Sequence, residues 1–397
     1  MKILVLAGGF PKINEGTDGN YVYAQVSELA KLGNEITVVS PTMYFPKAFS
    51  RIKKINRYIV PQNYIYDNIH VEAPKMLNYY CFSQYWTQFP NLFSKIYIAC
   101  IKNALLELLK NNYDVIYCMG SVLEAGTASW IKRKLPHLHI VYIEHSGDIV
   151  ASLQNNYTYR CFYRELIDSV DKIIFVSNKQ RMMINKYVDL CEKSVVLNNG
   201  FYGGESVVSY VKQGSILKII SVGALIERKG YRYSIKALSQ LRKEGYNFRF
   251  EIIGDGNQKE ELQKLVRECG IDDVTEFRGW QTHAEVLNAM AAADVFLMPS
   301  WNESFGIVYL EAMSCGIPVI GTVGEGIEDI ITDNCNGFLV RKQNYDNIYK
   351  VILKLINNPD FRHLVGSKGR MLSNEFTWRK NAEKLEKVLD DVCKLNT

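Results

Sequence analysis

Short hydrophobic runs of strand length alternate with amphipathic stretches along the whole chain. Each run is nearly continuous in apolar residues, which is typical of parallel strands that are covered on both faces. The runs predict strands within residues 2–8, 34–41, 113–121, 139–147, 171–178, 193–200, 217–225, 248–256, 274–280, 293–300, 317–322 and 336–340. Amphipathic stretches predict helices at 20–33, 231–245, 258–269, 282–292 and 344–357. The alternation indicates an α/β protein with doubly wound parallel sheets.

Both halves of the chain begin with an apolar strand that runs into glycine, Lys-Ile-Leu-Val-Leu-Ala-Gly in the first and Leu-Lys-Ile-Ile-Ser-Val-Gly in the second. At 397 residues the chain exceeds what one core usually organises. The segment 201–215 is rich in Gly and Ser and indicates a linker. We therefore predict two Rossmann-like domains, 1–205 and 206–377, that face a central cleft. A final helix, 378–397, can pack on either domain, including back on the first.

Composition narrows the class of protein. Hydrophobic residues make up 47% and charged residues 22%, as in ordinary globular chains. The net charge of +5 is concentrated between Ile36 and Leu106, which hold eight basic residues and two acidic ones. The nine cysteines form no Cys-x-x-Cys pair, which favours reduced thiols over a disulfide frame or a zinc site. No signal peptide or membrane-spanning segment is recognisable, so we expect a cytoplasmic protein.

Two glutamates, Glu303 and Glu311, stand eight positions apart after the strand at 293–300. Glu303 falls in the loop at the carboxyl edge of the predicted sheet. Ser304 resembles an N-cap, so we predict a helix from about Phe305 to Ser314. Glu311 then lies a little over two turns from Glu303, where it could reach a neighbouring part of one extended ligand.

The first amides of this predicted helix, those of Phe305, Gly306 and Ile307, and its positive end suit an anionic group. The alternative is a capped core helix with one solvated glutamate, since such helices are common after strands in α/β domains.

A second polar loop follows the strand at 217–225 and contains Arg228 and Lys229 before a glycine. Fixed cations at the carboxyl end of a strand are what a diphosphate leaving group requires, because negative charge builds on it as its bond breaks. A solvated basic turn is the alternative. Glycine turns at Gly223 and Gly254 follow the neighbouring strands, and a lone Gly-x-Gly is weak evidence of a ligand site.

These motifs resemble the nucleotide-sugar domain of retaining GT-B glycosyltransferases of family four, the group 1 glycosyl transferases. The resemblance covers residues 217–340 and rests on the segments VGALIERKG, IIGDG, FRGW, ADVFLMPSWNESFGIVYLEAMSCGIPVIGT and NGFLV, in family order and spacing. It implies the GT-B fold, with two Rossmann-like domains facing a central cleft. The first half fits the family more loosely.

The resemblance assigns roles position by position. Glu303 would contact the hydroxyls of the donor sugar, Glu311 would hold the ribose, and Lys229 would neutralise the diphosphate. The family often has Arg directly after the first glycine of the cation motif, where this chain has Ala224. Arg228 can take over that charge.

Gly279 and Trp280 match the segment whose backbone meets the nucleobase in this family. Trp280 can stack on the base or serve as a core or lid aromatic. In the first half, His145 ends a strand, where the family carries a cleft histidine, and the alternative is a structural imidazole. Gly16 and Gly19 lie in a loop before a helix, where either glycine could let the backbone approach phosphates or an acceptor, and the alternative is an ordinary flexible turn.

We therefore predict a hexosyltransferase that moves a hexosyl group from a nucleoside-diphosphate sugar (UDP or GDP) to an acceptor hydroxyl with retention, in surface glycan biosynthesis. His145, Glu303, Lys229 and Arg228 are predicted to act in catalysis. No cofactor or metal is expected, because no Asp-x-Asp occurs in the chain. The alternatives are a sugar-nucleotide epimerase on the same fold and a non-catalytic glycosyltransferase-like binding subunit.

The predicted partners are the nucleotide sugar and a glycan or lipid-linked glycan acceptor, and not nucleic acid. Residues 45–57 interleave Phe and Ile with Lys and Arg, a pattern suited to an anionic membrane surface at the inner face. Downstream, aromatic residues recur at helical spacing and can form either core or a surface for sugars and lipid headgroups. These are Phe82, Tyr85, Trp86, Phe89 and Phe93, with Pro90 expected to break any single helix.

Overall fold

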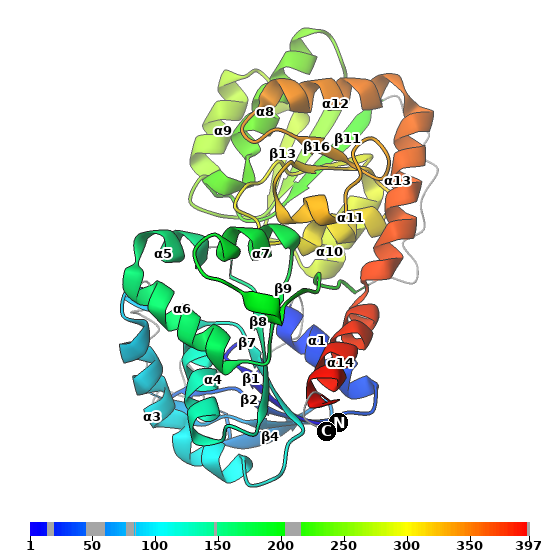
Figure 1. Ribbon diagram of the computed structural model, residues 1–397. Coiled ribbons are helices and arrows are strands. Elements are labelled where there is room, and N and C mark those ends of the chain that lie inside the picture. The colour runs from blue at the N-terminus through cyan, green and yellow to red at the C-terminus, as the bar shows by residue number, and fades with distance from the viewer. Residues whose placement is uncertain are drawn as a thin grey trace. The chain divides into compact units, whose positions relative to one another are not determined.

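The computed structural model describes residues 1–13, 20–44, 60–76, 83, 85–146, 149–202 and 216–394. The chain divides into two compact units (Figure 1). The first comprises Met1–Gly200 with Trp378–Thr397, and the second comprises Phe201–Thr377. Segment 45–57, Phe82, Gly16 and Gly19 lie outside the described residues.

The described part of the first unit contains an eight-stranded sheet in the order β10-β9-β8-β7-β1-β2-β5-β4. All neighbouring strands are parallel except β4 and β5, which pair antiparallel around Asp67 and Asn68. Both turn residues have positive φ, as a tight hairpin requires. The strands are β1 (Lys2–Ala7), β2 (Glu35–Val39), β4 (Asn63–Tyr66), β5 (Ile69–Glu72), β7 (Val115–Met119), β8 (His139–Glu144), β9 (Lys172–Phe175) and β10 (Ser194–Val196), with a separate pair of β3 (Thr42–Met43) and β6 (Lys75–Met76).

Helices connect the parallel strands of this unit, and several begin at side-chain caps. Ser121 and Glu124 form a capping box at the start of α4, and Asn20 caps α1. The helices are α1 (Tyr21–Lys31), α3 (Pro90–Leu108), α4 (Val122–Lys134), α5 (Ile149–Asn155), α6 (Tyr157–Ser169), α7 (Asn178–Asn185) and α14 (Trp378–Lys394). The final helix, α14, packs on α1, where Gln25 Nε2 donates a 2.7 Å hydrogen bond to Asn381 Oδ1.

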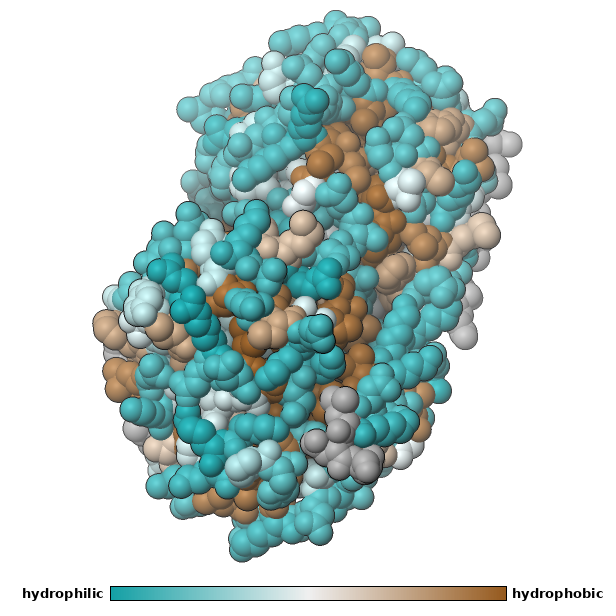
Figure 2. Space-filling view, viewed as in Figure 1, coloured by the Kyte–Doolittle hydropathy of each residue, from teal (hydrophilic) through white to brown (hydrophobic). Residues whose placement is uncertain are grey.

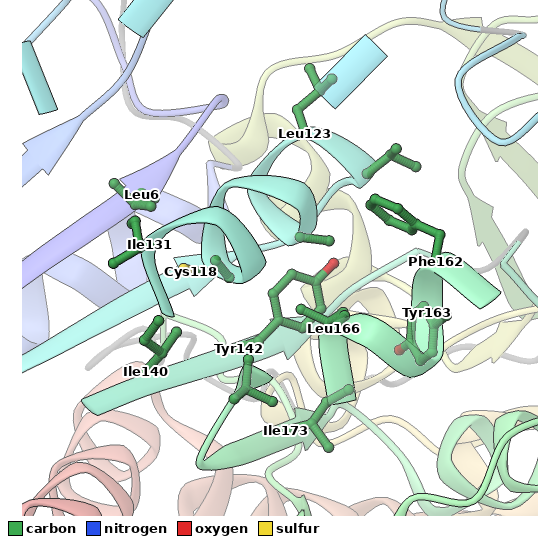
Figure 3. Close-up of a cluster of buried hydrophobic side chains, with 14 of the residues drawn as sticks. Leu6, Cys118, Leu123, Ile131, Ile140, Tyr142, Phe162, Tyr163, Leu166 and Ile173 are labelled. Atoms are coloured by element: carbon green, nitrogen blue, oxygen red, sulfur yellow. The ribbon is translucent and has the colours of Figure 1, made fainter. Parts of the chain in front are cut away.

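The core of the first unit is built from the inward faces of the sheet and its helices. Tyr142 on β8 lies beside Leu166 of α6, in a buried cluster that also contains Ile140 and Phe162 (Figure 3). The Leu166 side chain is fully buried. Burying a leucine or phenylalanine side chain stabilises the fold by about 1.5–3 kcal/mol, so this layer fixes β8 and the segment that follows it.

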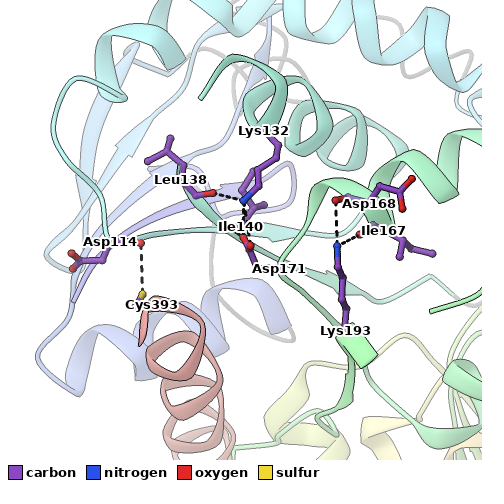
Figure 4. Close-up of polar contacts among 9 residues, drawn as sticks. All are labelled: Asp114, Lys132, Leu138, Ile140, Ile167, Asp168, Asp171, Lys193 and Cys393. Carbon is purple, nitrogen blue, oxygen red and sulfur yellow. Dashed lines mark hydrogen bonds and ion pairs between the residues drawn. The ribbon is translucent and has the colours of Figure 1, made fainter. Parts of the chain in front are cut away.

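Polar contacts tie the amino ends of the strands together (Figure 4). Lys132 Nζ donates to the Leu138 carbonyl at 2.8 Å and lies 3.1 Å from Asp171 Oδ2, which also accepts the Ile140 N–H at 2.7 Å. Lys193 Nζ donates to the carbonyl of Ile167 at 2.9 Å. These contacts hold the amino ends of β8, β9 and β10 beside α4 and α6.

The described part of the second unit contains a six-stranded parallel sheet in the order β13-β12-β11-β14-β15-β16. Counted within the unit this is the order 3-2-1-4-5-6, and the direction of winding reverses between β11 and β14. The strands are β11 (Leu217–Val222), β12 (Phe248–Ile253), β13 (Thr275–Gly279), β14 (Val295–Leu297), β15 (Val319–Thr322) and β16 (Phe338–Val340).

Helices cover both faces of this sheet (Figure 1). Helix α8 packs beside α9 and α12, and α11 packs beside α10 and α13. They are α8 (Tyr231–Lys243), α9 (Lys259–Glu268), α10 (His283–Ala292), α11 (Ile307–Ser314), α12 (Tyr345–Asn357) and α13 (Pro359–Ser373). The predicted α/β class with doubly wound parallel sheets is therefore confirmed.

The aromatic segment predicted as either core or surface divides between the two. Phe93 is buried and Trp86 packs on the core of the first unit, whereas Tyr85 and Phe89 are exposed. Pro90 does interrupt any helix through the whole segment, because it is the first residue of α3. Hydrophilic residues cover most of the face seen in Figure 2, with hydrophobic patches between them.

Candidate active site

The loops after β11 and β14 lie at the carboxyl edge of the second sheet, where its winding reverses. In open α/β sheets this reversal separates the loops on either side and leaves room for a ligand. The loop after β11 ends in the short turn Glu227–Lys229, and the loop after β14 carries Glu303 before α11. The fold therefore brings together two segments that are separated by more than seventy positions in the sequence.

Lys229, Arg228 and Glu303 meet at this edge. Lys229 Nζ lies 2.5 Å from Glu303 Oε2, and Arg228 Nη1 lies 3.5 Å from the same oxygen. The Lys229 and Glu303 side chains are 12% and 16% exposed, whereas Arg228 is 40% exposed. The two loops are also joined through the backbone, because the Trp301 N–H donates to the Arg228 carbonyl at 2.8 Å. Two predicted cations and a predicted carboxylate thus form one cluster.

Gly230 explains how the two loops approach so closely. Its φ of 76° is in the left-handed region, and a Cβ there would lie 2.4 Å from the Pro299 carbonyl oxygen. Only glycine fits such a contact without movement of the backbone. Gly230 therefore lets the cation turn dock on the loop that carries Glu303.

The predicted start of α11 is wrong by two residues. Helix α11 begins at Ile307, and its N-cap is Gly306 with φ of 89°, without a side-chain cap, so Ser304 is not the N-cap. A Cβ on Gly306 would lie 2.7 Å from the Tyr309 ring, which occupies the space below it. Phe305 precedes the helix, and its side chain is buried in the core.

Glu311 has a partner that the sequence did not predict. Its Oε1 lies 2.9 Å from Nε2 of His283, the first residue of α10. The two side chains are 15% and 28% exposed, respectively. The signal that could have found the position is the capping box of Thr282 and Glu285, which starts α10 and fixes the direction of its first turn.

Three predicted glycines line the same sheet edge and touch one another. The Gly223 N–H donates to the Ile253 carbonyl at 3.0 Å, and the Gly254 N–H donates to the Gly279 carbonyl at 2.8 Å. A Cβ on Gly254 would lie 2.0 Å from the Gly223 carbonyl oxygen, so the first two turns are in direct contact. A Cβ on Gly223 would lie 3.6 Å from Lys229 Cε, which places this turn beside the cation. Trp280 follows Gly279 and is 76% exposed.

His145 belongs to the first unit and follows β8. Its Nε2 is buried with no hydrogen-bond partner among the described residues, and its ring centroid lies 4.6 Å from that of Tyr21 on α1. Burial lowers the pKa of His145 to about 3, so the imidazole is neutral near pH 7. The neutral ring can donate or accept a hydrogen bond at Nε2.

The carboxyl group before His145 is also buried. Glu144 Oε1 accepts the Ser146 N–H at 2.9 Å, and Glu144 Oε2 lies 3.4 Å from the hydroxyl of Tyr163. Burial raises the pKa of Glu144 to about 7, and these hydrogen bonds partly oppose the shift. Glu144 thus anchors the segment that carries His145.

Among the described residues, no helix is both long enough and apolar enough to span a bilayer. Within the same residues, no group of three or more His, Cys, Asp and Glu side chains is arranged to hold a metal ion.

Both halves of the chain match glycosyltransferase families. The family described as "Glycosyl transferases group 1" matches residues 207–371, and "Glycosyltransferase Family 4" matches residues 19–201. An uncharacterized glycosyltransferase of Methanocaldococcus jannaschii is 28% identical over 279 residues, which are 70% of this chain and 76% of that protein. WcaL of Escherichia coli K12, whose name assigns it to colanic acid biosynthesis, is 37% identical over 130 residues, which are 31% of this chain and 32% of WcaL.

The fold has a solved counterpart in HepE of Anabaena, crystallised in complex with UDP and glucose. It aligns with a TM-score of 0.69 and 19% identity, and the alignment covers 98% of this chain and 100% of that chain. At this identity the likeness concerns the fold.

Proposed function

This chain belongs to the group 1 glycosyltransferases of the GT-B fold, and from that premise we propose that it transfers a hexosyl group from a UDP-sugar or GDP-sugar to an acceptor hydroxyl with retention. The observation that carries the proposal is the cluster of Lys229, Arg228 and Glu303 at the reversal point of the second sheet. The cluster offers cations for a diphosphate and a carboxylate for sugar hydroxyls side by side.

The leaving diphosphate is the part of the donor that Lys229 and Arg228 would stabilise. As the bond between the anomeric carbon and the phosphate oxygen breaks, its electron pair stays on the phosphate. Cations that are already in place stabilise this charge without reorganisation in the transition state. Lys229 is suited to this task because its ammonium is mostly buried and held by a carboxylate.

Glu303 and Glu311 would hold the two ends of the donor. The Glu303 carboxylate accepts hydrogen bonds from sugar hydroxyls, and the Glu311 carboxylate accepts them from the ribose. His283 contacts one oxygen of Glu311 and so orients that carboxylate. Gly223 and Gly254 let the backbone approach the phosphates, and Gly279 with Trp280 would lie near the base. Any ligand between them must be extended, because the glutamates occupy the loop and the second turn of α11.

The proposed reaction needs no separate strong base. The acceptor oxygen attacks the face of the anomeric carbon from which the phosphate departs, and the leaving phosphate oxygen receives the acceptor proton. Retention follows from bond making and bond breaking on one face. His145 is proposed to bond a sugar hydroxyl as a neutral imidazole, which its low pKa permits.

We propose that Lys229 and Arg228 make a divalent metal unnecessary. Turnover should then persist in excess EDTA, and activity that is lost with EDTA and restored by Mg²⁺ or Mn²⁺ would contradict this part of the proposal.

The acceptor is proposed to be a glycan or lipid-linked glycan of a surface polysaccharide, with the protein peripheral at the inner membrane face. The assignment of WcaL to colanic acid biosynthesis supports a polysaccharide acceptor. If the basic stretch 45–57 contacts anionic lipid, pelleting with phosphatidylglycerol vesicles should fall as salt rises. Salt-independent pelleting would argue against that surface.

Thermal shift with UDP, GDP and ADP, followed by hydrolysis assays with the matching sugar donors, tests the proposed function. We expect one diphosphate to raise the melting temperature and its sugar donor to be consumed. A protein that binds none of them would be a non-catalytic subunit, and one that converts the donor into another nucleotide sugar without an acceptor would be an epimerase.

A further inference from the structure

Glu325 is a buried carboxylate that contacts the backbone of Glu303. It lies after β15, is 7% exposed, and its Oε2 accepts the Glu303 N–H at 2.9 Å. The next residue returns a bond, because the Gly326 N–H donates to the Glu303 carbonyl at 3.3 Å. The segment after β15 therefore bonds both backbone polar groups of Glu303, its N–H and its carbonyl oxygen.

The two segments are packed without a gap between them. A Cβ on Gly326 would lie 2.0 Å from the Ser304 carbonyl oxygen and 2.8 Å from Phe305 Cα. Glycine at this position is thus what allows Glu325 to reach Glu303.

The Glu303 loop needs such support because its backbone is unusual. Asn302 has φ of 54° and Gly306 has φ of 89°, so left-handed residues stand on both sides of Glu303. A left-handed non-glycine residue costs about 1–3 kcal/mol unless its surroundings hold it. A carboxylate is also rarely buried without a partner, and the partner here is the amide of the residue that faces the cations.

Glu325 and Glu303 also act electrostatically on the same buried side chain, that of Tyr309. Burial, and beyond it the charges of Glu303 and Glu325, raise the pKa of the Tyr309 hydroxyl, so both carboxylates act on one buried group. Glu303 in turn contacts Lys229 and Arg228. Glu303 therefore connects Glu325 to Lys229 and Arg228, the cations that are predicted to bind the diphosphate.

We propose that Glu325 is a positioning residue that fixes the Glu303 backbone so that its carboxylate is held toward the donor sugar. This inference rests on the proposed function and extends it to a residue outside the predicted motif. Glu325 acts as a hydrogen-bond acceptor, so its oxygen matters more than its charge.

The test compares wild type with Glu325→Ala, Glu325→Gln and Glu328→Ala. Glutamine keeps a side-chain oxygen for the Glu303 amide, whereas alanine removes it. Glu328 is the matched control, because it lies on the same turn and accepts the Gly324 N–H at 2.5 Å but is exposed. Turnover is measured with whichever of UDP-glucose, GDP-mannose and ADP-glucose the wild type consumes, and the sugar-free diphosphate is titrated separately.

We expect Glu325→Ala to lower kcat by about tenfold to a hundredfold, as when a hydrogen bond to a charged group is lost. Its affinity for the sugar-free diphosphate should not fall and can rise up to about fivefold, because that ligand has no sugar for Glu303 to hold and a displaced Glu303 competes less for Lys229. Glu325→Gln and Glu328→Ala should keep most of the wild-type turnover. If Glu325→Ala does not fold, Gly326→Ala is the second variant, because its methyl group would displace the same backbone contact. It should likewise lower kcat without weakening the affinity for the sugar-free diphosphate.

An active wild type with an unimpaired Glu325→Ala variant overturns this proposal alone. So does Glu325→Gln that is as slow as the alanine variant, or diphosphate affinity that falls in parallel with kcat, since a merely damaged unit would give that result. A wild-type protein that acts on none of the donors overturns the proposed function and this proposal with it.

Discussion

Lys229 Nζ lies 2.5 Å from Glu303 Oε2, and this contact joins the loop after β11 to the loop after β14. Both side chains are largely buried, so the pair is weakly screened by solvent. A diphosphate that binds Lys229 must share the ammonium with Glu303 or displace it. The same carboxylate is predicted to bind the donor sugar, which couples recognition of the sugar to binding of the phosphates.

Replacing Lys229 with alanine should slow transfer strongly. Loss of one charge-stabilising donor costs roughly 3 kcal/mol in the transition state, which is about a hundredfold in kcat. Lys236→Ala, an exposed lysine on α8, is the control and should be silent. The measurement is steady-state turnover with saturating donor, and a Lys229 variant with wild-type turnover would remove this residue from the mechanism.

Glu303→Gln should separate binding from turnover. The substitution removes the carboxylate that competes for Lys229, so the diphosphate without sugar should bind about fivefold more tightly if that pair is worth about 1 kcal/mol. Transfer should fall, because the sugar loses its carboxylate acceptor. Isothermal titration with the diphosphate and a turnover assay measure the two effects, and weaker diphosphate binding would show that the pair does not compete with the ligand.

His283 and Glu311 should act as a unit in nucleotide binding. Glu311→Ala and His283→Ala should each weaken the diphosphate, and the double variant should lose less than the sum of the two, because contacting residues couple by about 0.5–3 kcal/mol. His363→Ala, an exposed histidine on α13, should bind as wild type does. Strictly additive losses would mean that His283 does not orient Glu311.

Gly230→Ala should destabilise the second unit more than Gly245→Ala does. Both glycines have φ in the left-handed region, but a Cβ on Gly230 would meet the Pro299 carbonyl, whereas nothing lies within 4 Å of one on Gly245. The shared strain costs about 1–2 kcal/mol, and the clash at Gly230 should add about 1–3 kcal/mol. Urea unfolding of the two variants measures the difference, and equal losses would contradict the docking of the two loops.

Glu144 should make stability depend on pH in one direction. Its folded pKa of about 7 lies above the unfolded value, so its protonated form stabilises the fold below about pH 4.5 and that contribution is lost as pH rises toward 7. The shift corresponds to about 3 kcal/mol. His145, whose folded pKa is lowered, has the opposite dependence over an overlapping range.

The effect of Glu144 is therefore isolated by comparing the free energy of unfolding of a Glu144 variant with that of wild type at each pH. Glu144→Gln should gain stability relative to wild type between pH 4.5 and 7.5, because the glutamine side chain does not titrate there. Urea unfolding at several pH values measures this. A constant difference for Glu144→Gln would contradict its raised pKa.

The sequence predicted the strands well because their apolar runs are nearly continuous. Each predicted strand range contains an observed strand, including the short ones at Val295–Leu297 and Phe338–Val340. The hairpin of β4 and β5 was missed, since its alternating exposed and buried positions at the sheet edge differ from the pattern of the buried strands. The Asp67–Asn68 turn is the local signal that marks it.

The candidate site was predicted in part. The position of each loop after a strand was enough to predict that Lys229 and Glu303 lie at one edge of the sheet. Their functional roles remain predictions. The contacts of Glu311 with His283 and of Glu303 with Glu325 join residues whose spacing follows no local period, so only the folded arrangement reveals them. Ser304 failed as a cap because the left-handed Gly306 sets the start of α11.

A crystal structure with the bound sugar donor tests the central claim most directly. The account predicts the diphosphate within about 4 Å of the Lys229 ammonium, in ion-pair range, with the sugar against Glu303 and the ribose against Glu311. A donor bound away from the Lys229 turn and the loop that carries Glu303 would contradict it.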